Sequence, residues 1–186
     1  MLCPGLGQRK DSTIYPALRI WDALLKRTTH LLTGAAIGSL MSLLLHQDTI
    51  SLMAIGAAFG VLPDIDILLS GFGKRIHRSP ATHSLLASSI MALAWLLLVV
   101  PMGRSLDPNP FSGIPPLPST VIAFLASFLH SAEDSLSVYG CRLFYPVSRR
   151  VFKGPVRYDD WAANGVLSFV AVAAIVASQL GSRPLS

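Results

Sequence analysis

The sequence is short of cysteine and of charge. It has only two cysteines, Cys3 and Cys141, in 186 residues. So few and distant thiols exclude a disulfide framework and a cysteine-built metal site, and histidine and carboxylate must supply any metal ligands. Charged residues make up 13% of the chain, hydrophobic residues 52%, and the mean hydropathy is +0.55. A soluble domain carries roughly 25% charged residues. The composition excludes a disordered chain and predicts a protein that lives in a bilayer.

Two sequence signals are also missing. Polar residues from Gln8 to Asp11 fall where a signal peptide needs an apolar core, which predicts that the N-terminal segment stays on the chain. Neither Ser79 nor Ser84 lies in a nucleophile-elbow motif. This argues against a serine hydrolase.

Five charge-free stretches predict an all-α integral membrane bundle of about five transmembrane helices. They run over residues 28–47, 49–63, 84–103, within 108–132, and 161–182. A bilayer core of ~30 Å needs about 20 mainly apolar residues in a helix. By this measure the third and fifth stretches qualify outright, the first and fourth are plausible spans, and the second is short. Before them, Ile14, Leu18, Trp21 and Leu25 have helical spacing, which predicts a short amphipathic helix in the headgroup layer.

The basic residues predict the orientation. With a cytoplasmic N-terminus, thirteen of the fifteen fall on the cytoplasmic side, where Lys and Arg accumulate in membrane proteins. These thirteen are Arg9, Lys10, Arg19, Lys26, Arg27, Lys74, Arg75, Arg78, Arg142, Arg149, Arg150, Lys153 and Arg157. Orientation therefore explains the pI of about 9.6, and nucleic acid is not an expected partner. We expect a cytoplasmic segment with the interfacial helix at 1–29, a membrane-embedded metal-binding domain at 30–182 and a tail at 183–186.

Seven histidine and aspartate residues lie at the cytoplasmic ends of the predicted spans. They are His30, Asp64, Asp66, His77, His83, His130 and Asp134. Because spans alternate in direction, residues at the starts of spans one and three and at the ends of spans two and four share one depth. Imidazole and carboxylate together suit zinc, manganese or iron better than calcium or magnesium. We therefore expect a site for one to three divalent transition-metal ions, with zinc as first choice, that activates water against a phosphoester.

Single members of this set also have plainer interpretations. His30 alone is typical of an interfacial or packing residue, and Asp64 with Asp66 of a helix-ending turn. His130 and Asp134, four residues apart on one helical face, could be only a hydrogen-bonded pair. The common depth of all seven favours a shared metal site, with Asp64 or Asp134 as the bridging ligand.

Other residues carry weaker predictions. Glu133, beside Asp134, is open between a partner of a ligand, a catalytic base and an ordinary solvated or paired carboxylate. Arg78 is the candidate for holding a substrate phosphate. His46 falls in a short turn at the opposite side and is expected to be a solvated loop residue. The small residues Gly34, Gly38, Ser42, Gly56 and Gly60 indicate close helix packing.

Several motifs in order carry a family resemblance. They are Thr29 to Gly34, Gly60 to Asp66, His77-Arg78 with Thr82-His83-Ser84, and His130 and Asp134 followed by Tyr139-Gly140 and Leu143 to Pro146. From Thr29 to Ser148 the chain resembles the YdjM family of membrane-bound, predicted metal-dependent hydrolases, which includes the bacterial LexA-binding inner-membrane protein. The resemblance implies a helical membrane protein with a metal centre. A distant similarity of the family to zinc-dependent phospholipase C makes phosphodiesters the favoured substrate class.

The chain departs from the family pattern between His77 and His83. Ser79, Pro80 and Ala81 stand where the family usually has a glycine after His-Arg. The departure leaves the substrate shape and the role of His77 open, whereas all seven candidate ligands are retained.

The predicted function is therefore a multi-pass cell-membrane hydrolase of the phosphoester class. Its metal site would lie near the cytoplasmic face, with Asp64, Asp134 and Glu133 as catalytic candidates and membrane lipids as neighbours or substrates. The alternative is a noncatalytic membrane scaffold, in which a structural metal holds the spans together and basic loops recruit a cytosolic regulatory protein. A transporter is disfavoured because the polar groups at one face offer no path through the midplane.

Overall fold

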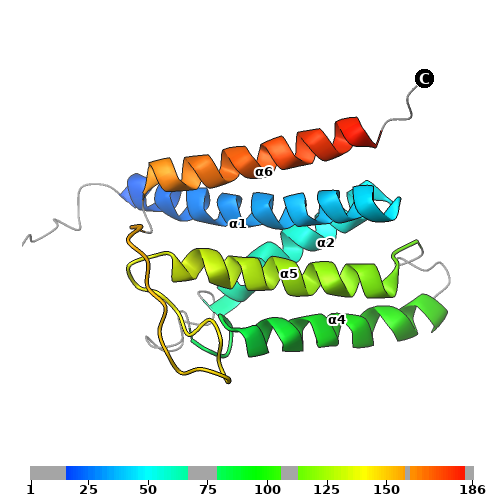
Figure 1. Ribbon diagram of the computed structural model, residues 1–186, viewed down its shortest axis with the longest axis horizontal. Coiled ribbons are helices and arrows are strands. Elements are labelled where there is room, and N and C mark those ends of the chain that lie inside the picture. Colours follow the sequence, from blue (N-terminus) through cyan, green and yellow to red (C-terminus); the bar gives the residue numbers. More distant parts are fainter. Residues whose placement is uncertain (1–15, 67–78, 106–112, 158–159, 183–186) are drawn as a thin grey trace, which may run out of the picture.

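A computed structural model describes residues 16–66, 79–105, 113–157 and 160–182 of the chain. Within these residues the protein is all-helical, with five α-helices, one short 3-10 helix and no β-strand (Figure 1). The elements are α1 (Pro16–Leu45), α2 (Thr49–Val61), η1 (Leu62–Asp64), α4 (Leu85–Ser105), α5 (Pro116–Ser135) and α6 (Trp161–Gly181). Figure 1 shows α6, α1, α5 and α4 side by side, with α2 crossing behind them.

Glycines let α1 and α2 pack with their backbones in contact. A Cβ built on Gly34 would lie 2.1 Å from the carbonyl oxygen of Gly56, and one on Gly56 would lie 2.1 Å from that of Gly34. Farther along, a Cβ on Gly60 would lie 2.3 Å from the carbonyl oxygen of His30. No larger residue fits this crossing, which confirms that the small-residue series serves helix packing. It also brings the end of α2 against His30.

The apolar core lies between α2 and α5. Its buried residues are Leu52, Ile55 and Phe59 from α2 and Ile122, Ala123 and Ala126 from α5. Trp95 of α4 packs against this core and donates its indole N–H to the Ser119 hydroxyl of α5 (3.0 Å). The core therefore fixes α5, which carries three of the site residues, on α2.

Buried hydroxyl groups hold α6 against α1. The hydroxyls of Ser39 and Ser178 are hydrogen-bonded at 2.5 Å, and those of Thr29 and Ser168 at 3.2 Å. The outer side of α6 is apolar and exposed, with Phe169 at 74% accessibility. Hydroxyl pairs between helices with apolar outer faces are typical of membrane bundles.

Two helical segments are long and apolar enough to cross a membrane by length and composition. They are Arg27–Leu45, of which half is buried, and Trp161–Gly181, of which 11% is buried. Thr49–Asp64 and Leu85–Pro101 are shorter apolar helices. The predicted helices are therefore present in all five stretches, whereas a count of five spans stays a prediction.

The helix ends refine two expectations from the sequence. The amphipathic stretch before Thr28 and the first apolar stretch form one continuous helix, α1, because nothing in the sequence between them breaks a helix. His46 is exposed and has a left-handed φ of 51° just after α1, where Gln47 N–H donates to the Ser42 carbonyl (3.1 Å). Its prediction as a solvated turn residue is confirmed.

The segment after α5 folds back over one end of the bundle. Cys141 and Phe152 exchange two backbone hydrogen bonds, and Val156 N–H donates to the Leu136 carbonyl (3.2 Å). The same segment accepts hydrogen bonds from the first turn of α4, since the N–H of Leu85 donates to the Leu143 carbonyl at 2.7 Å. The fold thus joins the C-terminal end of α5 to the N-terminal end of α4.

Candidate metal centre

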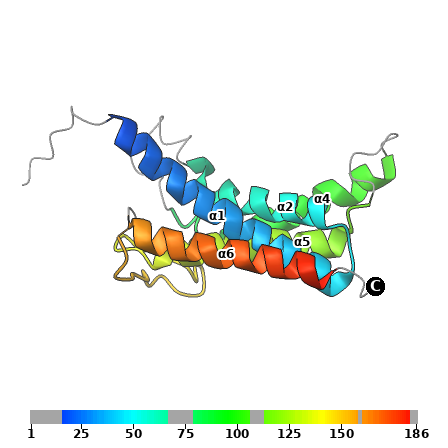
Figure 2. The ribbon, with the colours of Figure 1, turned by 90° about the horizontal axis from the view of Figure 1, so that it is seen from above.

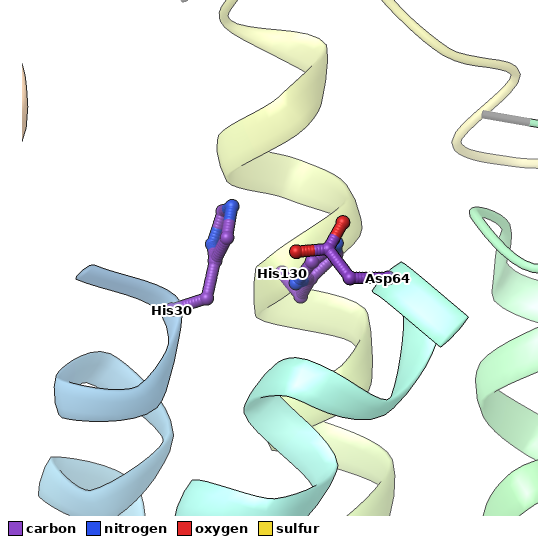
Figure 3. A group of neighbouring side chains, drawn as sticks. All are labelled: His30, Asp64 and His130. Carbon is purple, nitrogen blue, oxygen red and sulfur yellow. The ribbon is translucent and has the colours of Figure 1, made fainter. Parts of the chain in front are cut away.

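Five of the seven predicted ligands gather their ligand atoms at one end of the bundle, and Asp66 lies behind one of them, with Oδ2 3.4 Å from Nδ1 of His83. His30 comes from α1, Asp64 from η1, Asp66 from just after η1, His83 from the turn before α4, and His130 and Asp134 from α5. Figure 3 shows His30, Asp64 and His130 converging from three different elements. His77 and Arg78 lie outside the described residues, so their predicted roles as ligand and phosphate binder stay predictions.

Pro63 explains how Asp64 reaches the cluster. Proline has no N–H to donate, so it cannot continue the hydrogen-bond ladder of an α-helix. The backbone tightens after Val61 into the single 3-10 turn of η1. At its end the Asp64 carboxylate, 11% exposed, lies 3.6 Å from Nε2 of His130. Asp66, two residues later, is fully buried.

His83 is fixed by the residues on either side of it. Ser84 is the N-cap of α4, where its hydroxyl accepts from Ala87 N–H (3.1 Å). On the other side, the Thr82 hydroxyl donates to Oδ2 of Asp66 (2.9 Å) and lies 2.8 Å from Nδ1 of His83. With the hydroxyl proton directed to Asp66, Nδ1 of His83 donates to the Thr82 oxygen. The lone pair of a neutral His83 is then on Nε2.

The backbone of α2 sets the tautomer of His130. Nδ1 of His130 lies 2.8 Å from the carbonyl oxygen of Gly60. A carbonyl only accepts, so Nδ1 carries the proton and the lone pair of a neutral His130 is on Nε2. That Nε2 lies 3.1 Å from Nε2 of His83. In these tautomers two neutral imidazoles present Nε2 to each other, an approach that a cation bound by both would suit.

Glu133 orients His30 as the Gly60 carbonyl orients His130. Its Oε2 lies 2.5 Å from Nδ1 of His30, and both side chains are at most 10% exposed. The contact places the Nδ1 proton toward Glu133 and turns Nε2 toward Asp134, whose Oδ1 is 3.9 Å away. The geometry pairs Glu133 with His30, whereas its roles as a partner of a metal ligand or as a base stay predictions. Such a carboxylate behind an imidazole raises the basicity of the metal-facing nitrogen.

Asp134 lies between two of the imidazoles. Its Oδ1 faces His30, and its Oδ2 lies 3.3 Å from Nε2 of His83. The rings of His30 and His130 are also close, with centroids 4.0 Å apart. A carboxylate whose two oxygens face different histidines has the arrangement of a bridging ligand.

The donor set fits a divalent transition metal. Two groups each have ligand atoms that all lie within 4.8 Å of one another, namely His30, Asp64 and His130, and His83, His130 and Asp134. Nitrogen and carboxylate oxygen together favour zinc, manganese or iron. Each imidazole also has its other nitrogen held from behind, as metal-binding histidines almost always do. These buried groups could therefore hold metal ions, whose identity the geometry leaves open.

Two cavities adjoin the cluster. One, of about 430 Å³, reaches His30, Glu133 and Asp134 and is also lined by Arg157 and by the first turns of α6. The other, of about 380 Å³, reaches Asp64 and is also lined by Arg27. Each cavity is therefore lined both by one arginine and by residues of the histidine and carboxylate cluster.

Sequence reasoning missed the groups that orient the histidines. The Gly60 carbonyl is a backbone group with no signal of its own, and Thr82 was noticed only as part of a motif. The sequence marks Arg157 only as an orientation signal, whereas in the structure it lines a cavity beside the cluster. Their positions depend on how α2, the turn before α4 and the segment after α5 meet, which side-chain spacing does not encode.

The fold and the site together define a class of protein, a helical bundle with a buried histidine and carboxylate cluster able to hold metal. Its apolar helices have the composition of membrane helices. The chain belongs to the family described as YdjM inner membrane protein, whose sequence model matches residues 25–184. No curated protein and no solved structure matches the chain. Family membership and the apolar helices point to a membrane environment.

Proposed function

We propose that the protein is a multi-pass membrane hydrolase that uses bound divalent metal, with zinc as first choice, to cleave a phosphoester at the cytoplasmic face. One observation carries the proposal. The metal-facing nitrogens of His30, His83 and His130 gather with the carboxylates of Asp64 and Asp134, while each outer nitrogen faces a partner. A purely structural hydrogen-bond network has no need to orient three imidazoles alike.

The carboxylate of Asp134 is the reason for proposing two ions. The two ligand groups share His130, and since one imidazole nitrogen binds one ion, Nε2 of His130 would serve only one of them. The two oxygens of Asp134 face different histidines, which supports a bridge between a His30 side and a His83 side. Bound ions of this kind polarise a phosphoryl oxygen and make water a nucleophile near neutral pH.

The residues of the chain have separate tasks in this proposal. Asp134 and the imidazoles hold the ions, and Glu133 keeps His30 in the tautomer that can bind. Asp64, which lines the second cavity, is the candidate that accepts the proton of the attacking water. The phosphorus–oxygen ester bond breaks as the new bond to the water oxygen forms, and the leaving alkoxide takes up a proton.

The cavities favour a catalytic site over the noncatalytic scaffold. Structural zinc sites are closed by protein ligands, whereas catalytic sites keep an open position. Here a cavity of about 430 Å³ reaches two candidate ligands and Glu133. A scaffold would leave these carboxylates behind a closed surface.

Hydrolysis by the purified protein tests the proposal. Protein in detergent is loaded with zinc or manganese and given bis(p-nitrophenyl) phosphate and mixed phospholipid micelles. We expect phosphate-ester cleavage that stops on chelation and is lost in His83→Ala and Asp64→Ala. Asp48→Asn, at an exposed helix cap far from the cluster, is the control and should keep its activity. Metal-loaded, folded protein that cleaves none of these esters would favour the scaffold.

A further inference from the structure

The larger cavity has a mixed lining. It includes His30, Glu133 and Asp134 of the candidate metal centre together with the apolar side chains of Leu136, Val156, Val166 and Leu167. The polar residues Thr29, Ser137, Asn164 and Arg157 also line it. A volume of about 430 Å³ lies within the range of small-molecule sites. A ligand that has both a polar and an apolar part suits this lining.

Arg157 gives the cavity a positive charge. The backbone on both sides of Arg157 is held, because Val156 N–H donates to the Leu136 carbonyl (3.2 Å) and Asp160 N–H donates to the Arg157 carbonyl (3.0 Å). Arg157 also lines the cavity, and a guanidinium can bind a phosphate through two parallel hydrogen bonds. Arg157 therefore offers a partner for an anion in this cavity.

The apolar wall continues into the outer surface of α6. Val166 lines the cavity and is 63% exposed, and Phe169 and Val170 extend the exposed apolar surface along the same helix. This helix is one of the two segments long and apolar enough to span a membrane. A hydrocarbon chain bound in the cavity can therefore continue along α6 without entering water. Figure 2 shows α6 on the outside of the bundle along its whole length.

We propose that this cavity binds an anionic lipid, with the phosphate at Arg157 beside the metal centre and the hydrocarbon chain along α6. The inference rests on the proposed function and names its substrate class as a lipid phosphoester. A water-soluble phosphate would make no use of the apolar wall, and an uncharged lipid would make no use of Arg157. Each buried methylene adds about fourfold to the affinity.

Photolabelling in nanodiscs tests this binding site. The probe is dodecylphosphonate with a diazirine at the end of its chain, whose carbon–phosphorus bond resists hydrolysis, in nanodiscs of zwitterionic phosphatidylcholine. We expect saturable labelling of α6 and of the segment after α5. Unlabelled dodecylphosphonate should compete, whereas propylphosphonate, without the chain, and dodecyltrimethylammonium, without the anion, should not.

Variants test the anion-binding part and the hydrocarbon-binding part of the site one at a time. Arg157→Gln should raise the half-saturating probe concentration about tenfold. Arg150→Gln removes an exposed arginine of the same segment outside the cavity and should change it less than twofold. Ala163→Phe should fill the cavity and abolish saturable labelling, whereas Ala173→Phe, on the exposed side of the same helix, should not.

Three results would overturn the inference. Equal competition by propylphosphonate would leave an anion site without a lipid chain. Equal competition by dodecyltrimethylammonium, or labelling indifferent to Arg157→Gln and Ala163→Phe, would leave only partition into the bilayer. Metal content of the same samples keeps the two proposals apart. Metal-bound but unlabelled protein contradicts the lipid site alone, and labelled protein without metal contradicts the metal-dependent function alone.

Discussion

Glu133 offers the sharpest perturbation of the candidate metal centre. It is the only glutamate of the chain, and its Oε2 lies 2.5 Å from Nδ1 of His30. Both side chains are at most 10% exposed. Since Glu133 faces the outer nitrogen of His30, a substitution should weaken metal binding without removing a ligand.

The expected loss of metal affinity depends on whether the substituted side chain can still accept the Nδ1 proton of His30. The amide oxygen of Glu133→Gln can still accept the Nδ1 proton but has no charge to raise the basicity of Nε2, and we expect about tenfold weaker metal binding. Glu133→Ala loses the acceptor as well and should weaken binding about a hundredfold. These factors correspond to about 1.4 and 2.7 kcal/mol.

Competition with a chromophoric zinc chelator measures both affinities in detergent. Asp48→Asn, which changes an exposed carboxylate at the N-cap of α2, serves as the control and should leave zinc affinity unchanged. If Glu133→Ala binds zinc within twofold of the wild type, His30 is not a ligand oriented by Glu133, and the reasoning about the three tautomers is refuted.

Further predictions concern the helix contacts that support the site, each read as the free energy of reversible unfolding in mixed micelles. Gly56→Ala should destabilise by about 1–3 kcal/mol because its Cβ meets the Gly34 carbonyl, whereas Gly165→Ala, with nothing within 4 Å, should stabilise by about 0.5–1 kcal/mol. If Gly165→Ala destabilised the protein and Gly56→Ala did not, the close crossing of α1 and α2 would be contradicted. Ser178→Ala removes the buried hydroxyl pair between α1 and α6 and should destabilise by about 1 kcal/mol; no change would mean that the pair adds nothing. His46→Gly should stabilise by about 0.5–1 kcal/mol because glycine accepts the left-handed φ, with His46→Ala as a control that gains nothing.

The helices were largely predictable from the sequence, because charge-free stretches and their boundaries carry the signal. Each of the five stretches contains one helix, and Pro63 ends α2 close to the predicted point. The number of membrane crossings was less predictable, since hydropathy alone does not say which apolar faces are covered by other helices. The two segments that qualify by length and composition are the first and last.

The gathering of the polar residues was predictable for a different reason. Helices that alternate in direction bring the start of one helix beside the end of the next, and so His30, Asp64 and His130 meet. The outer partners were not predictable, because the Gly60 carbonyl faces His130 only through the packing of α2 on α5. The cavity at Arg157 likewise depends on the fold of the segment after α5.

Anomalous diffraction at the zinc edge from crystals of the zinc-loaded protein tests the central claim most directly. The account predicts two peaks within the cluster, about 2.0–2.1 Å from imidazole Nε2 atoms. One peak should lie beside Oδ1 of Asp134 and the other beside its Oδ2. Crystals with no anomalous peak among His30, His83 and His130 would contradict the metal centre and the function proposed for it.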